Sequence, residues 1–247
     1  MMKRLILLPL VFIFLFTGCD REDAWDIFKT RGAPAVEHVT LNAFNSITIH
    51  NGINVVLTQG DSHAATIEGW RNLMPKIRLS VDNDGMLTIE DANSFNFVRS
   101  RDNMTTVYLS FADELNTIIF SGNGDITTTD VIDISDLSIY GLKGSGSIDL
   151  KVNTHNINIH TNLGNTASIT LSGQSNSVFV DNRGYNPVYL FDLLTLSAEI
   201  HQHGLGNTFV YASETLTVVL YSSGNVHYKG NPEVNLTLKG RGSLYKF

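Results

Sequence analysis

Two histidines stand out as residues that could bind a metal. His201 and His203 are two positions apart, so on a β-strand both side chains face the same side. A zinc site needs at least three protein ligands, and His160 or His227 would supply the third only in a particular strand register. Histidines spaced in this way are also common on solvent-facing strands. The pattern therefore favours surface histidines, and we expect no metal and no cofactor.

Three aspartates recur at every third position, at Asp130, Asp133 and Asp136. Acidic clusters of this kind occur in β-helical enzymes that degrade polysaccharides, where inverting hydrolysis needs two carboxylates about 6.5–9.5 Å apart. Residues three apart on a strand face opposite sides, so only a turn would bring these side chains together. The spacing leaves catalysis open but does not favour it, and no catalytic residue is assigned.

Polar residues recur at one position of several glycine-containing turns. Stacked turns would align them in a ladder that could hold calcium or sugar hydroxyls, but calcium requires several oxygen ligands around one ion. Only one of the five is a carboxylate, which favours the simpler interpretation that they satisfy the backbone of the turns. The five residues are Asp125, Ser147, Asn207, Asn225 and Ser243.

Aromatic residues are spread along the chain at positions that could form a binding face for sugar or protein. Tyrosine is also common in strands for packing alone, so the composition does not decide between the two roles. The candidates are Phe95, Phe97, Tyr185, Tyr189, Tyr221 and Tyr228.

Cys19, the only cysteine, follows a segment typical of export signals. Lys3 and Arg4 precede an apolar run over residues 5–16, which is shorter than the about 20 residues of a membrane span. Residues 15–19 resemble a bacterial lipobox, in which the cysteine is acylated, with palmitate for example. We therefore predict a lipoprotein signal peptide over residues 1–18 and lipid attachment at Cys19. The alternatives are a signal peptide without lipid or an uncleaved anchor.

Charge and composition exclude several classes of protein. The net charge is −7, and removal of residues 1–18 would take away two basic residues and leave −9. An acidic chain without a basic stripe is not expected to bind nucleic acid. Charged residues make up only 17% of the chain, which disfavours long charged helices. A single cysteine excludes a disulfide framework.

The elements that must position these residues are short strands separated by turns. Residues 46–50, 53–57, 77–81 and 87–89 alternate polar and apolar side chains, and turn signals such as Asn51-Gly52 lie between them. We expect a tether over residues 19–38 and a single all-β domain over residues 39–247.

The second half of the chain repeats a glycine-containing turn. The spacing is 22 residues from Gly124 to Gly146 and 21 from Gly146 to Ala167. Further along it is 18 residues from Gly206 to Gly224, and 18 again to Gly242. A period near 20 with Gly- and Asn-rich corners predicts a β-solenoid resembling a parallel β-helix. An antiparallel β-sandwich with glycine-rich hairpin loops is the alternative.

Together these features resemble the family called putative auto-transporter adhesin, head GIN domain, over residues 39–245. The tripeptide that names the family stands at Gly52-Ile53-Asn54, and repeated Ser-Gly-x-Gly turns follow. The chain departs from the family pattern at Ala167 and between Asn176 and His203, where the coil register stays open. The resemblance implies a β-helical domain of a Gram-negative envelope lipoprotein and brings no catalytic residues with it.

The sequence therefore predicts a lipid-anchored, non-enzymatic module of the cell envelope that faces the periplasm or the cell surface. Its ligand would be a protein or a carbohydrate, as for an adhesin. Asp20, next to the modified cysteine, resembles an inner-membrane retention signal and leaves the leaflet open. A β-helical enzyme acting on polysaccharide and a scaffold for an envelope complex are the alternatives.

Overall fold

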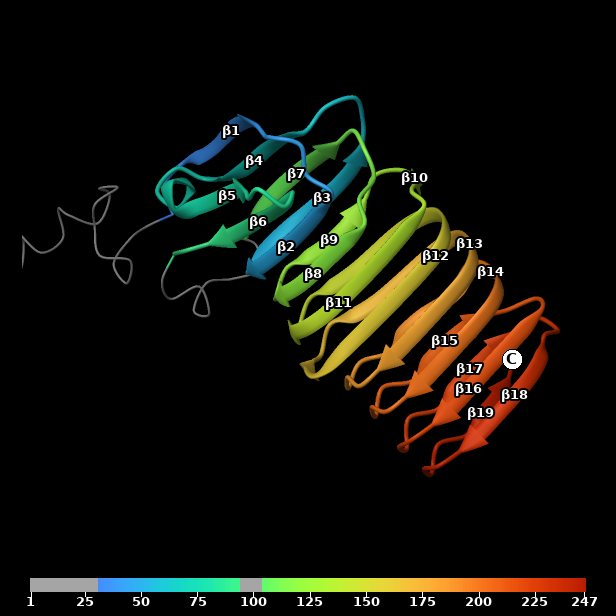
Figure 1. Ribbon diagram of the computed structural model, residues 1–247. Coiled ribbons are helices and arrows are strands. Elements are labelled where there is room, and N and C mark those ends of the chain that lie inside the picture. The colour runs from blue at the N-terminus through green and yellow to red at the C-terminus, as the bar shows by residue number, and fades with distance from the viewer. Residues whose placement is uncertain (1–30, 94–103) are drawn as a thin grey trace, which may run out of the picture.

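The computed structural model describes residues 31–93 and 104–247 (Figure 1). Its only helical element among these residues is the short 3-10 turn η1 (Met74–Lys76), and the rest consists of strands and turns. The strands stack side by side into a parallel β-solenoid with two faces, which we call face A and face B. The predicted solenoid is thus confirmed, and the alternative of an antiparallel sandwich is wrong.

Each coil of the solenoid contributes one strand to each face. Face A contains β2 (Ser46–Asn51), β6 (Met86–Asp91), β8 (Thr117–Gly122), β11 (Asp136–Gly144), β16 (Thr215–Leu220) and β18 (Glu233–Leu238). Face B contains β3 (Ile53–Gln59), β7 (Thr105–Phe111), β9 (Asp125–Thr128), β15 (Thr208–Tyr211), β17 (Val226–Lys229) and β19 (Leu244–Lys246). Three long strands bend from face B into face A: β12 (Ser147–Asn165), β13 (Ser168–Asn182) and β14 (Val188–Gln202). The short β10 (Ile132–Asp133) pairs with β12.

The alternation of side chains places the core between the two faces. On face A, Ile159, Val180 and Ile200 lie in register on neighbouring coils and are fully buried. On face B, Ile148 and Ile169 lie in register and are equally buried. Because successive residues of a strand point to opposite sides, the residues between these positions face solvent. The apolar alternation in the sequence therefore identifies the inward side correctly.

The register between coils confirms the repeat spacings. Ser147 pairs with Asp125 and with Ser168, which are offsets of 22 and 21 residues. Val226 pairs with Thr208 and with Leu244, at an offset of 18 in both cases. The register that the sequence left open is an offset of 20 between the later parts of β13 and β14, after a shift between Thr170 and Ser172 (offset 19 before it).

Antiparallel strands close the N-terminal end of the stack. β1 (Pro34–Thr40) pairs with β4 (Ala64–Trp70), which pairs with β7, and β5 (Ile77–Val81) pairs with β6. The first strand therefore begins at Pro34, inside the segment 19–38 expected to be a tether. Glycine and proline at 32 and 34 suggested a linker, but Ala35 and Val39 pack against the core from this strand.

Glycine corners allow the coils to approach closely. A Cβ atom at Gly146 would collide with the carbonyl oxygen of Gly124 on the preceding coil. By contrast, a Cβ at Gly164 would meet only the Cβ of Lys143 at 3.7 Å and the carbonyl oxygen of Leu142 at 3.8 Å, both ordinary contacts. The recurrent glycines thus mark the places where one backbone lies directly on the next.

We expect Gly146→Ala to destabilise the fold by about 1–3 kcal/mol, because the added methyl group must push two backbones apart. Urea denaturation followed by circular dichroism would measure this as a lower midpoint. Gly164→Ala is the matched control and should leave the midpoint nearly unchanged. Equal midpoints for the two variants would contradict the proposed close contact.

Candidate functional site

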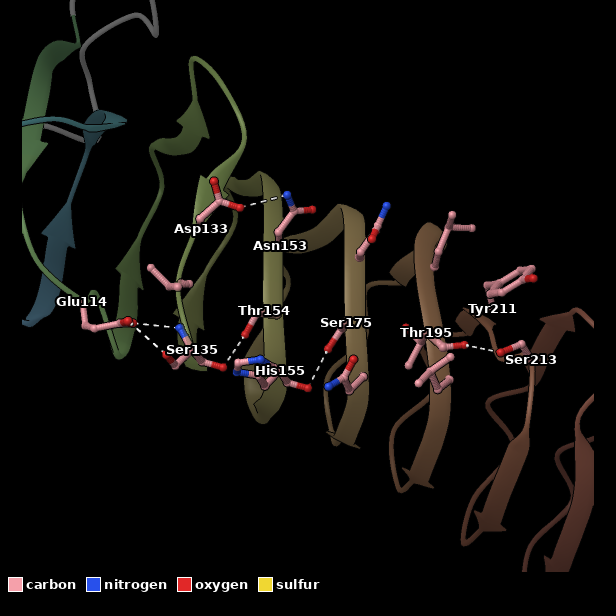
Figure 2. Close-up of a pocket in the computed structure, with 15 residues that line it drawn as sticks. Glu114, Asp133, Ser135, Asn153, Thr154, His155, Ser175, Thr195, Tyr211 and Ser213 are labelled. Atoms are coloured by element: carbon pink, nitrogen blue, oxygen red, sulfur yellow. Dashed lines mark hydrogen bonds between the residues drawn. The ribbon is translucent and has the colours of Figure 1, made fainter.

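An open groove of about 710 Å³ runs across successive coils where face B bends into face A (Figure 2). The same corner of each coil contributes to it, so the groove follows the axis of the stack. Its lining is mostly polar and uncharged, with apolar side chains toward the C-terminal end. The lining residues are Glu114, Asp133, Ile134, Ser135, Asn153, Thr154, His155, Gln174, Ser175, Asn176, Leu194, Thr195, Leu196, Tyr211 and Ser213.

Small hydroxyl side chains tie the corners together along the floor of the groove. The Glu114 carboxylate accepts hydrogen bonds from the backbone N–H of Ser135 at 2.8 Å and from its hydroxyl at 3.0 Å. Thr154 Oγ1 then donates to the carbonyl oxygen of Ser135 at 2.8 Å. Side-chain to carbonyl bonds of the same kind continue in later coils, from Ser175 to His155 and from Ser213 to Thr195.

One wall of the groove is a row of side chains from equivalent positions on neighbouring coils. Asp133, Asn153, Gln174 and Leu194 pair in register, and Figure 2 shows Tyr211 beyond them. Asn153 Nδ2 donates to Asp133 Oδ1 at 2.9 Å, whereas the Gln174 side chain is exposed. Leu194 is 53% exposed, which is high for leucine. The wall therefore passes from hydrogen-bonding groups to apolar ones.

The structure does not gather the three aspartates found in the sequence. Only Asp133 lines the groove, while Asp136 accepts a hydrogen bond from Asn156 Nδ2 at 2.7 Å and Asp130 lies in the turn before β10. The second carboxylate of the groove is Glu114, which sequence reasoning missed. Its only signal was its place about one coil before Ser135.

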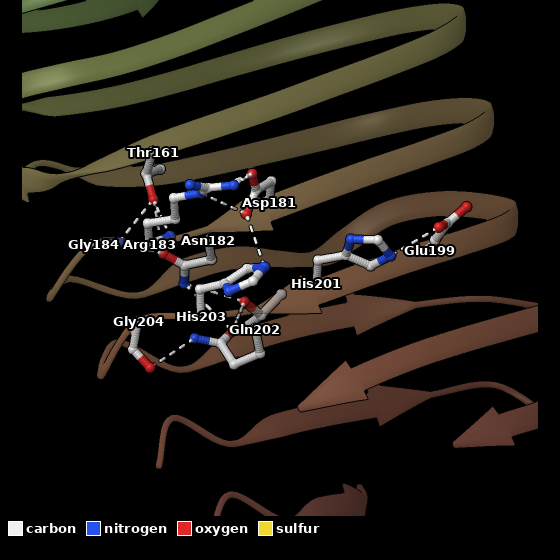
Figure 3. Close-up of polar contacts among 11 residues, drawn as sticks. Thr161, Asp181, Asn182, Arg183, Gly184, Glu199, His201, Gln202, His203 and Gly204 are labelled. Atoms are coloured by element: carbon white, nitrogen blue, oxygen red, sulfur yellow. Dashed lines mark hydrogen bonds and ion pairs between the residues drawn. The ribbon is translucent and has the colours of Figure 1, made fainter. Parts of the chain in front are cut away.

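Figure 3 shows His201 beside Glu199 and His203 beside Asp181. The two histidines lie on the same side of the chain, as predicted, since both rings contact Tyr221. His203 stacks on Tyr221 with ring centroids 3.9 Å apart. His201 Nε2 lies 2.9 Å from Glu199 Oε1. No group of three or more metal-binding side chains occurs among the described residues.

The other two histidines considered as metal ligands lie elsewhere. His160 stacks on Tyr140 on face A, and His227 stacks between Phe209 and Tyr245 on face B. Each ring is thus part of an aromatic stack. The coil register separates His160 and His227 onto opposite faces, so the four histidines do not surround one point.

Burial lowers the pKa of His203 below its ordinary value of 6.5, while the nearby Asp181 carboxylate opposes this and Arg183 reinforces it. His203 Nε2 lies 3.8 Å from Asp181 Oδ1, and Arg183 pairs with the same carboxylate at 2.9 Å. Below pH 6.5 the unfolded chain takes up this proton more readily than the folded one. The contribution of neutral His203 to the free energy of unfolding is therefore complete above pH 6.5. It is lost as the pH falls toward the lower pKa that this ring has in the folded protein.

A buried polar network surrounds the glycine turns after β13 and β14, where the repeat departs from its pattern. Thr161 Oγ1 donates to Asn182 Oδ1 at 2.9 Å, and Thr208 Oγ1 donates to Gln202 Oε1 at 2.8 Å. Gln202 Nε2 also donates to the carbonyl oxygen of Gly206 at 2.7 Å. Asn182, Gln202 and Thr208 are completely buried. These side chains therefore satisfy turn backbone from inside the coil.

The polar ladder satisfies the backbone of neighbouring coils. Asp125 Oδ1 accepts from the backbone N–H of Ser147 at 3.0 Å and from its hydroxyl at 2.7 Å. Asn54, the last residue of the tripeptide at 52–54, accepts from the backbone N–H of Asp125 at 3.0 Å. The same bond joins Asn207 to Asn225 and Asn225 to Ser243, each at 2.9 Å. The ladder is thus structural.

The candidate aromatic residues lie in different places. Tyr189 begins a stacked row on face B, Tyr221 lies on face A, and Tyr185 is exposed in a turn. Tyr228 instead points inward and packs against the core. Phe95 and Phe97 lie outside the described residues, as do Cys19 and Asp20. The row on face B continues from Tyr189 through Phe209, His227 and Tyr245.

Comparison with protein families gives the class to which this fold and groove belong. Residues 43–232 match the family described as "Putative auto-transporter adhesin, head GIN domain", and the chain is a member of that family. The family's description points to the cell envelope or surface. Comparison with curated proteins gave no significant match. In the described part of the chain, no helix is long and apolar enough to span a membrane.

Solved structures share the fold. A "putative adhesin" from Bacteroides fragilis is 21% identical, with a TM-score of 0.76 over 87% of this chain and 97% of that one. A "putative lipid binding protein" from Parabacteroides distasonis is also 21% identical, with a TM-score of 0.63 and the same coverage of both chains. A "putative adhesin" from the same species is 20% identical, with a TM-score of 0.60 over 87% of this chain and 98% of that one. At these identities the likeness establishes the fold.

We expect the imidazole of His203 to titrate below pH 6.5, and Asp181→Asn to lower its midpoint further. The variant removes the only carboxylate that favours the charged ring and leaves Arg183 unopposed. Nuclear magnetic resonance of the ring protons would measure both midpoints.

Glu199→Gln is the matched control for this titration, because its carboxylate pairs with His201 rather than His203. It should move the midpoint of His203 less than Asp181→Asn does. A higher midpoint for His203 in Asp181→Asn would contradict the assigned role of the carboxylate.

Proposed function

We propose that this protein is a lipid-anchored, non-enzymatic binding module of the cell envelope whose groove binds an extended carbohydrate. The observation that carries the proposal is the course of the groove along the axis of the solenoid. Neighbouring strands are about 4.7–4.9 Å apart, so the wall offers a side chain at regular intervals. A chain of repeating sugar units matches such a surface better than a compact ligand does.

The chemistry of the groove suits sugar hydroxyls and the apolar faces of sugar rings. Asp133, Asn153 and Gln174 offer both donors and acceptors, and no lysine or arginine lines the groove. Leu194 and Tyr211 add apolar area at the other end of the row. Binding sites commonly combine apolar lining with a few polar groups that fix orientation. A neutral polysaccharide is thus the favoured class.

The hydrogen bonds of the two carboxylates support binding rather than catalysis. Both oxygens of Glu114 accept bonds from Ser135, and Asp133 accepts one from Asn153. These bonds hold the corners of adjacent coils together, so both carboxylates already have partners within the fold. A structural role of this kind supports a binding groove more than a catalytic pair.

The proposed partners and location follow from the N-terminal segment and the charge. Acyl chains on Cys19 would contribute about 0.8 kcal/mol for each buried methylene group and hold the domain at a membrane. The mature chain would be acidic, which disfavours nucleic acid as a partner. Asp20 favours the inner membrane, from which the domain would face the periplasm. Anchoring in the outer membrane, with the domain at the periplasm or the cell surface, is the alternative.

We expect Gln174→Ala and Tyr211→Ala each to weaken polysaccharide binding about 5- to 30-fold, since each removes about 1–2 kcal/mol of contact. An array of neutral and acidic polysaccharides would first identify a bound glycan. Titration calorimetry with that glycan would then compare the variants.

Asn158→Ala is the matched control for the groove, because this asparagine lies on face A away from the lining. It should bind as tightly as the unchanged protein. Equal weakening by all three substitutions would contradict the assignment of the groove. Cleavage of the glycan into shorter products during incubation would instead support the alternative of a polysaccharide-degrading enzyme.

We expect Cys19→Ser to abolish palmitate incorporation and signal-peptide processing at residue 19, because the thiol is the acceptor of the acyl chains. Metabolic labelling with palmitate and fractionation of membranes would show both effects. Ser62→Ala, in a turn of the folded domain, is a control that should be labelled normally. A Cys19→Ser protein labelled and processed like the unchanged one would refute lipid attachment.

A further inference from the structure

The C-terminal end of the solenoid exposes inward-facing apolar residues. Val234, Leu236 and Leu238 of β18 are 37%, 42% and 61% exposed. Their partners one coil earlier are completely buried, at Leu216, Val218 and Leu220. The three residues follow the inward alternation of face A, but no further coil within residues 31–93 and 104–247 covers them. The core of the stack is therefore open at this end.

The same strand has a free hydrogen-bonding edge, because β18 pairs only with β16 among the described residues. The backbone N–H groups of Glu233 and Lys239 donate to β16 and the corner before it, at 2.8 Å in each case. Backbone groups alternate in direction along a strand, so the N–H and C=O groups of the odd-numbered residues of β18 point toward β16. The N–H and C=O groups of Val234, Leu236 and Leu238 therefore point away from β16, outward along the solenoid axis.

Two features distinguish β18 from the other terminal strands of the described residues. On face B, Lys246 lies in line with inward-facing Leu244 and donates to Asn231 Oδ1 at 2.8 Å. Inward-pointing charges are a known means of protecting sheet edges. At the N-terminal end, the terminal strands β1 and β5 run antiparallel to their neighbours, and η1 buries Met74.

We propose that β18 pairs with β18 of a second copy in an antiparallel arrangement, with the two-fold axis at Leu236. In this register Leu236 lies opposite its own equivalent, and Val234 lies opposite Leu238. These are the residues whose backbone groups are free, so each pair can exchange two hydrogen bonds. Their side chains face inward together and close both open cores with one apolar layer.

Charge complementarity favours a second copy over an unrelated partner. The two-fold register places Glu233 opposite Lys239 of the second copy at each end of the paired strands. Both side chains lie on the outer surface, where Lys239 Nζ sits 4.7 Å above the Tyr221 ring. A two-fold contact requires a self-complementary surface, and an acid at one end of a strand with a base at the other provides one.

We expect the full-length protein in density-matched detergent to sediment with twice the mass of one chain. Leu236→Lys should halve that mass, because it places two like charges on the two-fold axis. Leu236 is already 42% exposed in one chain, so the variant should keep its circular dichroism spectrum. Thr237→Lys is the matched control, since this side chain faces outward, and it should stay dimeric.

Cysteine cross-linking tests the register directly. In the proposed pairing Asn235 lies opposite Thr237 of the second copy, with Cα atoms about 4.5 Å apart. A mixture of Asn235→Cys and Thr237→Cys chains should therefore form a disulfide-linked dimer under mild oxidation. Either variant alone should link several-fold less, because identical residues would be more than about 7 Å apart. The unchanged protein measures any linkage through Cys19.

Three results would overturn the proposal. One is a monomeric mass for the unchanged protein, and another is a dimer that Leu236→Lys leaves intact. The third is equal cross-linking of the single variants and their mixture, which would indicate a different register or random encounter.

Discussion

The fold depends on one constraint, the close stacking of each coil on the backbone of the one before it. A strand in a parallel stack satisfies its N–H and C=O groups only if both neighbours lie at the spacing of a sheet. At the corners this spacing leaves no room for a side chain, and at Gly146 a single methyl group would strike the carbonyl oxygen of Gly124. The regular recurrence of glycine in the sequence is a consequence of that constraint.

The coils around Asn182 and Gln202 keep glycine at their corners and add buried polar side chains to it. At the ends of β13 and β14, Asn182 and Gln202 occupy inward positions that hold apolar residues in the first coils. Both amides donate to the carbonyl oxygen of Gly206, and burying such a group without a partner costs about 1–3 kcal/mol. The backbones of adjacent coils still lie in close contact here, since a Cβ atom at Gly204 would collide with the carbonyl oxygen of Gly184. The buried amides therefore add to this contact by satisfying turn backbone from inside the coil.

The contrast between glycine corners and buried amide side chains explains how much of the structure could be predicted from the sequence. Apolar alternation and glycine spacing follow directly from the stacking rule, so strands, inward side and coil length were recognisable. The register near Asn182 was not, because a buried amide looks like a surface residue in a sequence. The groove was missed for a related reason. Its wall is defined by position, and residues as different as Asp133 and Leu194 share that position without sharing a type.

The proposed glycan contact and the proposed contact with a second copy lie in perpendicular directions on the stack. The groove runs along the side of the stack, whereas β18 lies at the end opposite β1, which leads toward the N-terminus (Figure 1). Pairing through β18 would place the N-terminal ends of two copies at the far ends of one continuous solenoid. Two such copies anchored by lipid would lie flat on one membrane or connect two facing surfaces. None of the residues that line the groove belongs to β18, so pairing through this strand and glycan binding are compatible.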